Sequence, residues 1–214
     1  MKSRLILALA TLTLLSTVRA DVLDEIKPLQ QRWAEVSYQL AEDKRAEAFA
    51  QLLAQADDVV QANAGKAEAY IWRGIVASGY AGAKGGLGAL SLAKQSKADL
   101  EQALQLDDTA LLGSAYTSLG ALYYKVPGWP VGFGSDKKAR LMLEKALALN
   151  PQGIDPNYFY AEFLMQQRDY TAAMRYLEIA KQAPARPDRL LADTGRRQEL
   201  LQLEKKLHKK LKTN

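Results

Sequence analysis

The feature that most constrains this fold is a spaced pattern of small and apolar residues within a helix-forming sequence. It is clearest in one segment, where the spaced residues are Tyr116, Leu119, Gly120, Tyr123, Ala139, Leu143, Ala146 and Pro151. Steps of three and four residues place each set on one face of a helix. Gly120 and Ala139 let two helices approach closely, and Leu143 fills the space between them. Pro151 ends the second helix, so the segment predicts a packed helix pair.

Weaker copies of the pattern lie on both sides of this segment. The upstream copy keeps Tyr70, Gly74, Leu100, Ala103 and Asp108, but Arg73 and Ser96 depart from the Leu and Ala expected there. The downstream copy runs from Asn157 to about Ala185 and keeps Ala161, Ala173, Leu177 and Ala180. Residues 23–41 and 45–63 add one more helical pair without a clear motif. The chain is therefore predicted to repeat a helix pair about four times.

These residues and spacings resemble the tetratricopeptide repeat, in which two packed helices form each unit. The resemblance implies an all-α, TPR-like α-solenoid of about four helix pairs, with an open concave groove along one side. We expect the repeat domain to span residues 21–185. Residues 186–214 are expected to form a C-terminal capping helix and basic tail, because leucines from Leu190 to Leu211 make one stripe among charged residues.

Two connections are longer than the repeat requires. Twelve positions separate Ala161 from Ala173, but nineteen separate Gly120 from Ala139 and twenty-two separate Gly74 from Ser96. The sequence therefore predicts enlarged, glycine-rich loops at 79–88 and 126–134, and such loops commonly carry function. The second loop holds Trp129 and Phe133. Trp129 has two interpretations, either as an aromatic presented to a ligand or partner or as a core plug at one end of the groove.

The N-terminal segment predicts export. Lys2 and Arg4 precede an apolar stretch from Leu5 to Leu15 that is too short to cross a bilayer, and Val18 and Ala20 suit cleavage before Asp21. The alternative is an uncleaved membrane-anchoring start. The chain has no cysteine, so neither a disulfide nor a lipid-anchored cysteine is available. We expect a periplasmic protein with residues 1–20 removed and no transmembrane segment in the mature chain.

Composition and motifs argue against several functional classes. The formal charge of +5 is concentrated in the N-terminal segment and the lysines after Lys205, so no nucleic-acid partner is expected. The single histidine, His208, lies in that basic tail, and we predict neither an enzyme, a metal site nor a cofactor. The glycines at 82–88 and 132–134 do not follow a strand, and Ser135 is expected to cap a helix instead of binding phosphate.

The export signal, the loop 126–134 and the segment 147–151 together resemble the T-component proteins of TRAP transporters. That resemblance implies a periplasmic helical scaffold that docks a solute-binding protein or accepts a largely apolar small molecule. Groove positions carried over from the repeat pattern, with the loop aromatics, give candidate binding residues Ile71, Ile75, Tyr124, Lys125, Trp129, Phe133, Tyr158, Glu162 and Met165. Two hypotheses remain open: a scaffold for an envelope protein or peptide, and a binding protein for a hydrophobic small molecule.

Overall fold

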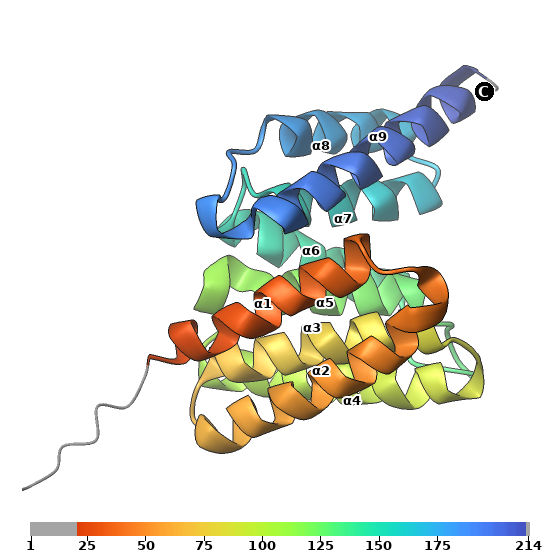
Figure 1. The fold of residues 1–214 in the computed structure, drawn as a ribbon. Helices are drawn as coiled ribbons and strands as arrows, with labels where there is room; N and C mark the ends of the chain where they lie inside the picture. The colour runs from red at the N-terminus through yellow and green to blue at the C-terminus, as the bar shows by residue number, and fades with distance from the viewer. Residues whose placement is uncertain (1–20, 213–214) are drawn as a thin grey trace, which may run out of the picture.

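The computed structural model describes residues 21–212, except for the side chain of Leu87, and this part of the chain is helical throughout (Figure 1). The predicted signal segment, residues 1–20, lies outside the described residues. The helices are α1 Val22–Tyr38, α2 Glu42–Ala62, α3 Ala67–Lys84, α4 Gly86–Leu106, α5 Ala110–Lys125, α6 Asp136–Leu149, α7 Ile154–Gln166, α8 Tyr170–Gln182, the short 3-10 helix η1 Pro187–Arg189, and α9 Leu190–Lys212. None of them is long and apolar enough to cross a membrane.

The predicted helix pairs are confirmed. Helix α3 packs on α4, α5 on α6, and α7 on α8. In the central pair, a Cβ atom on Gly120 would lie 2.5 Å from Cγ of Leu143, so only glycine allows this approach. Gly74 meets Leu100 in the same way in the preceding pair. The motif residues Ala161, Ala173 and Leu177 are fully buried between α7 and α8.

The two departures in the upstream copy have polar partners. The guanidinium of Arg73 donates hydrogen bonds to both carboxylate oxygens of Asp99, at 3.0 and 2.5 Å. The Ser96 hydroxyl donates to the carbonyl oxygen of Gly74 at 2.6 Å. Arg73 and Ser96 therefore still allow α3 to pack on α4, because the polar groups that they bring into the contact are hydrogen-bonded.

The predicted groove is only partly open, because the stack of helices closes on itself. Helix α1 contacts α3, α3 contacts α5, α5 contacts α7, α7 contacts α9, and α9 contacts α1. Figure 1 shows α9, in blue, returning across the front of the molecule above α1. We call α1, α3, α5, α7 and α9 the inner ring. The C-terminal helix therefore joins the two ends of the stack instead of only covering its last repeat.

The glycine-rich stretch 79–88 is mostly helix, so the prediction of an enlarged loop there is wrong. Helix α3 continues to Lys84 and α4 begins at Gly86. Gly79 lies inside α3 at a point where there is no room for a side chain, because an added Cβ would lie 2.8 Å from the Phe49 ring. The whole turn is made at Gly85 and Gly86, whose φ angles of 60° and 58° favour glycine.

The second predicted loop is present and tightly folded. Between α5 and α6, the amide of Gly134 donates to the carbonyl of Pro127 at 3.0 Å, and the amide of Ser135 donates to the carbonyl of Tyr123 at 2.8 Å. A Cβ on Gly132 would lie 2.5 Å from the Pro127 carbonyl oxygen, so a side chain is excluded there. Ser135 then caps α6 as predicted, accepting a hydrogen bond from the Lys138 amide.

Candidate functional site

The inner ring surrounds a partly open cavity of about 1260 Å³. All five of its helices line the cavity, and the first half of α4 adds part of the wall. Ligand pockets in proteins commonly measure about 300 to 1,000 Å³, so this space is large for one small molecule. The lining is divided, with ionised side chains near the starts of α7 and α9 and aliphatic side chains along α3, α4 and α5. The cavity can therefore hold a molecule with two chemically different ends.

The charged end is centred on Asp155, at the start of α7. One oxygen of its carboxylate accepts a hydrogen bond from Arg196 at 2.8 Å, and the other accepts from Arg186 at 2.7 Å. Arg186 is also held by Asp193 on α9, at 2.7 Å. Burial alone would raise the pKa of Asp155, but the charges of Arg196 and Arg186 outweigh burial and lower it to about 2. Asp155 is therefore ionised at neutral pH and ties α7 to α9.

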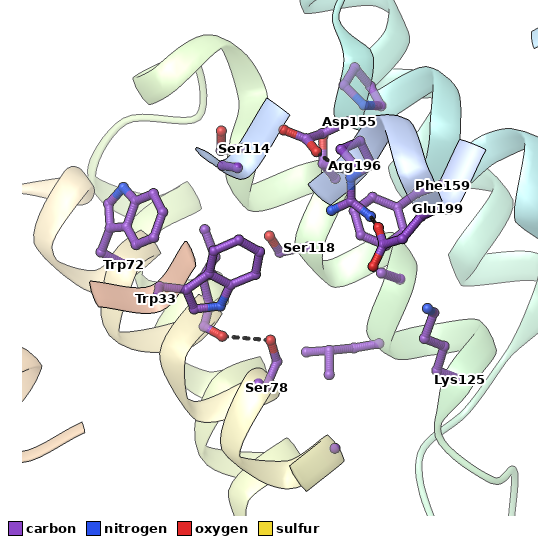
Figure 2. Close-up of a pocket in the computed structure, with 18 of the residues that line it drawn as sticks. Trp33, Trp72, Ser78, Ser114, Ser118, Lys125, Asp155, Phe159, Arg196 and Glu199 are labelled. Carbon is purple, nitrogen blue, oxygen red and sulfur yellow. Dashed lines mark hydrogen bonds and ion pairs between the residues drawn. The ribbon is translucent and has the colours of Figure 1, made fainter. Parts of the chain in front are cut away.

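The same charged end forms the seam between α9 and α1. Arg196 reaches from α9 to Asp155 and Glu199, as Figure 2 shows, and its guanidinium lies 4.4 Å from the centre of the Tyr158 ring. On the α1 side, the Tyr38 hydroxyl donates to Glu199 at 3.5 Å. Burial, above other causes, raises the pKa of Tyr38 to about 12, so this hydroxyl keeps its proton at neutral pH. One hydrogen bond therefore crosses from α1 to α9, whereas the contacts of Arg196 lie within α9 and between α9 and α7.

Four of the predicted binding residues form one cluster beside the cavity. The Glu162 carboxylate accepts hydrogen bonds from the hydroxyls of Tyr124 at 2.6 Å and Tyr158 at 3.4 Å, and it pairs with Lys125 at 2.8 Å. Burial would raise the pKa of Glu162, but Lys125 and the hydrogen bonds lower it. Lys125 itself lines the cavity. The groove register carried over from the repeat pattern therefore brings these side chains together across α5 and α7.

The remaining predicted residues are dispersed. Ile75 lines the cavity, whereas Ile71 is fully buried in the core and Met165 packs against that core. Phe133 packs edge-on against Tyr123, with ring centres 5.9 Å apart. Trp129 is 90% exposed, so the interpretation of Trp129 as a core plug is wrong. Neither loop aromatic belongs to the cavity wall.

Both glycine-rich segments nevertheless meet at one end of the cavity. Gly82 and Gly86 contribute to its wall from the turn between α3 and α4, and Pro127 and Val131 contribute from the loop between α5 and α6. Figure 2 places Lys125 at this end, away from Trp72 and Ser114. The loops thus surround the end of the cavity that lies opposite η1.

A strained turn forms part of the wall near the charged end. Leu111, Leu112 and Gly113, at the start of α5, have φ angles of 48°, 54° and 75°. The left-handed region costs a residue other than glycine about 1 to 2 kcal/mol. Leu111 and Leu112 both line the cavity, although Leu112 is largely exposed. Backbone strain is thus located at the cavity wall, where functional sites often hold it.

Several cavity residues could not be found from the repeat pattern. Trp33 belongs to α1, whose motif is degenerate, and Arg189 and Arg196 belong to the segment expected only to cap the stack. Trp72 lies in α3 beside predicted groove positions, but the pattern gives it no groove role. The one signal in the sequence was the cluster of arginines at 186, 189, 196 and 197, and it points to the cavity only once α9 is known to reach it.

Comparisons with known proteins give no family. No protein-family model matches the chain, and no curated protein matches it. One similar solved structure is described as "Functional Characterization of Pseudomonas Aeruginosa pilF"; the match covers 85% of this chain and 92% of that chain, at 16% sequence identity and a TM-score of 0.36. The TPR-like fold is therefore assigned from the helix pairs themselves. Among residues 21–212, no group of three or more His, Cys, Asp or Glu side chains is placed to hold a metal ion.

Proposed function

We propose that this protein binds a small, largely apolar molecule inside its inner ring, as an exported binding protein of the cell envelope. One observation carries the proposal: the contact between α1 and α9 turns the expected open groove into a cavity of about 1260 Å³. A groove that accepts an extended peptide needs an open side. The seam covers part of that side. A cavity lined on several sides instead suits a small molecule, and its volume leaves room for a ligand larger than most pockets hold.

The lining supports a binding role more than a catalytic one. The carboxylates at and beside the cavity are paired with cations, as Asp155 is with Arg196 and Glu162 is with Lys125. Paired groups of this kind fix helices in place, whereas general acid and base catalysis needs a group free to exchange a proton. Periplasmic location remains part of the proposal and is supported by the sequence of residues 1–20.

Dye binding tests the cavity directly. N-phenyl-1-naphthylamine, a neutral apolar dye, should bind with a large increase in fluorescence, since the cavity removes it from water. Ala121→Phe adds a ring at a cavity-lining position of α5 and should weaken dye binding about tenfold. Ala148→Phe adds the same ring on an exposed face of α6 and should leave binding unchanged. Equal dye binding by all three proteins would mean that the dye binds elsewhere, and the proposal would fail.

A second candidate function is a scaffold for an envelope protein, and the exposed Trp129 favours it. A tryptophan that is 90% exposed on a tightly hydrogen-bonded loop resembles the aromatic anchors of protein interfaces. If a partner docks there, Trp129→Ala should lose capture of that partner from envelope extract while cavity binding is retained. Capture that survives this change would exclude the loop as the docking site.

A further inference from the structure

The cavity has hydrogen-bond donors that no protein group satisfies. In the described part of the chain, four buried side-chain polar atoms have no hydrogen-bond partner: Nε1 of Trp33, Nε1 of Trp72, Nε of Arg189 and Oδ1 of Asn157. The first three are N–H donors, and all three residues line the cavity. A buried donor without an acceptor costs about 1 to 3 kcal/mol. The unpaired buried polar atoms of the cavity-lining residues are therefore all donors, and a ligand that binds there could supply acceptors.

Arg189 differs from the other cations of the cavity in its partners. Lys125 pairs with Glu162, Arg186 with Asp155 and Asp193, and Arg196 with Asp155 and Glu199. Among residues 21–212 no carboxylate pairs with Arg189, and no acceptor takes a hydrogen bond from its guanidinium. Its guanidinium instead lies 4.9 Å from the centre of the Trp72 ring.

The hydrogen bonds of the neighbouring carboxylates explain why Arg189 has no ion-pair partner. Asp155 and Asp193 lie close enough to favour its charged form, but their oxygens already accept hydrogen bonds from Arg186 and Arg196. Burial, with the neighbouring charge of Arg186, lowers the pKa of Arg189. A cation in this position would be stabilised by an additional anion.

Apart from Lys125, the opposite part of the cavity is largely aliphatic. Ile75, Ala89, Leu90, Ala121, Leu122 and Val126 line it from α3, α4 and α5. Trp72 lies near the start of α3, whereas Gly82 and the aliphatic wall lie toward its end, so the unpaired cation and the apolar surface occupy different ends. Figure 2 shows Trp72 and Lys125 on opposite sides of the cavity, and the cation at the far side, Lys125, is paired with Glu162.

We propose that the ligand is a monocarboxylate with an apolar chain, whose carboxylate binds the Arg189 guanidinium beside Trp72 and whose chain extends along α3 and α5 toward loop 126–134. This inference rests on the proposed function, since it names the ligand class of the same cavity. An arginine presents a fork of N–H donors that matches a carboxylate, and the pair would form in a partly dry site where charged hydrogen bonds are strong. The aliphatic wall would bind the chain by removing it from water.

Matched ligands test the proposal. Dodecanoate and dodecan-1-ol have chains of the same length, and both can be titrated against the bound neutral dye at pH 7. Wild-type protein should bind the carboxylate at least tenfold more tightly than the alcohol, because a hydrogen bond to a charged group is worth about that factor. Equal affinities would overturn the carboxylate assignment and leave the cavity function standing. Failure of the dye, the acid and the alcohol to bind would instead overturn the proposed function.

A variant pair locates the site on Arg189. Arg189→Gln should weaken dodecanoate binding about tenfold or more and change dodecan-1-ol binding by less than about twofold. Arg175→Gln, on the exposed face of α8, removes the same charge and should change neither affinity. Because Arg189 has no ion pair to lose, Arg189→Gln should melt within a few degrees of wild type. An acid affinity that survives this variant would show that another group binds the carboxylate, and the assignment to Arg189 would be withdrawn.

Discussion

The α5–α6 contact and the α9–α1 contact each depend on a glycine that lets a second helix approach closely. The two glycines have different surroundings. At Gly120, α6 approaches until Leu143 covers the missing side chain, and the surrounding contact is apolar. At Gly195, α1 approaches until the Tyr38 ring covers the glycine, but the neighbours include Arg196, hydrogen-bonded to Glu199. One contact joins neighbouring helices, and the other joins the two ends of the repeat domain.

The difference shows how the molecule combines a stable stack with a closed cavity. Apolar packing between adjacent helices is non-directional and tolerates a range of geometries. At the seam, the Tyr38 hydroxyl donates to Glu199, and the ion pairs between Arg196 and both Asp155 and Glu199 lie beside it. Such ion pairs require fixed positions, so they help to specify where α9 lies relative to α7. If this comparison is right, changes at the seam should affect both stability and cavity binding, whereas changes within a pair should affect stability first.

The largest effect is expected for Arg196→Met. Arg196 is almost completely buried, and its removal would leave Glu199 without its guanidinium and Asp155 with Arg186 alone. Breaking a buried ion pair by removing one partner typically costs about 3 to 5 kcal/mol. Urea denaturation should show that loss, and dye binding should weaken with it because α9, which lines the cavity, would be held less firmly to α7.

Arg32→Met is the control for this variant. Arg32 on α1 pairs with Glu35 at 2.9 Å, but both side chains are largely exposed, so the change should cost about 0 to 1 kcal/mol. If the two variants lose the same free energy of unfolding, the seam contributes no more than a surface pair.

The second prediction concerns pH and Asp155. Its pKa of about 2 in the folded protein lies below the value of about 3.9 expected for an unfolded chain. The native state therefore holds the carboxylate more strongly in its ionised form, which contributes about 2 to 3 kcal/mol above roughly pH 4. That contribution should be lost as the pH falls from about 4 to about 2.

Urea denaturation between pH 5 and pH 2 measures this slope. Asp155→Asn has no such carboxylate, so its stability should depend less on pH across this window than that of wild type. Asp43→Asn removes one carboxylate from the exposed side of α2 and serves as the control. An Asp155→Asn protein with the wild-type slope would assign the pH dependence to other groups.

The third prediction tests the apolar contact. Gly120→Leu places a side chain where Leu143 already lies, and overpacking of this kind costs about 1 to 3 kcal/mol. Gly65→Leu adds the same side chain to an open turn, where no neighbouring atom lies within 4 Å of the added Cβ, and should cost less. A melting temperature that Gly120→Leu leaves unchanged would contradict the close approach of α5 and α6.

The repeat residues predicted the helix pairs because their contacts are local in sequence. Gly120 and Leu143 belong to one motif, and the spacing that identifies them also brings their helices together. Gly195 and Tyr38 belong to no shared motif, and their contact depends on the accumulated rotation of every helix pair between them. The open groove was therefore a reasonable expectation, but the closed cavity required the three-dimensional structure.

The residues of the candidate site also fall into those that a local repeat pattern predicts and those that depend on contacts distant in sequence. Tyr124, Lys125, Tyr158 and Glu162 were predicted because the repeat pattern assigns groove positions one helix at a time. Trp33, Arg189 and Arg196 were missed since they reach the cavity only through the closure. The two prolines and three glycines correctly predicted an enlarged loop at 126–134. They could not distinguish the different positions of Trp129 and Phe133.

The smallest effect is expected for Trp129→Ala, and the comparison with Phe133→Ala makes it informative. Both aromatics lie in one loop, yet Phe133 packs edge-on against Tyr123 and lies 5.9 Å from the Lys97 ammonium, whereas Trp129 is 90% exposed. Phe133→Ala should therefore cost about 1 to 2 kcal/mol, since it removes an aromatic pair and its partly buried surface. Trp129→Ala should change the free energy of unfolding by no more than about 0.5 kcal/mol, as expected for a surface position. Urea denaturation of the two variants decides between structural and surface roles for each ring. A loss at Trp129 as large as that at Phe133 would show that the indole packs on the protein in solution, and the docking role proposed for it would then lose its only support.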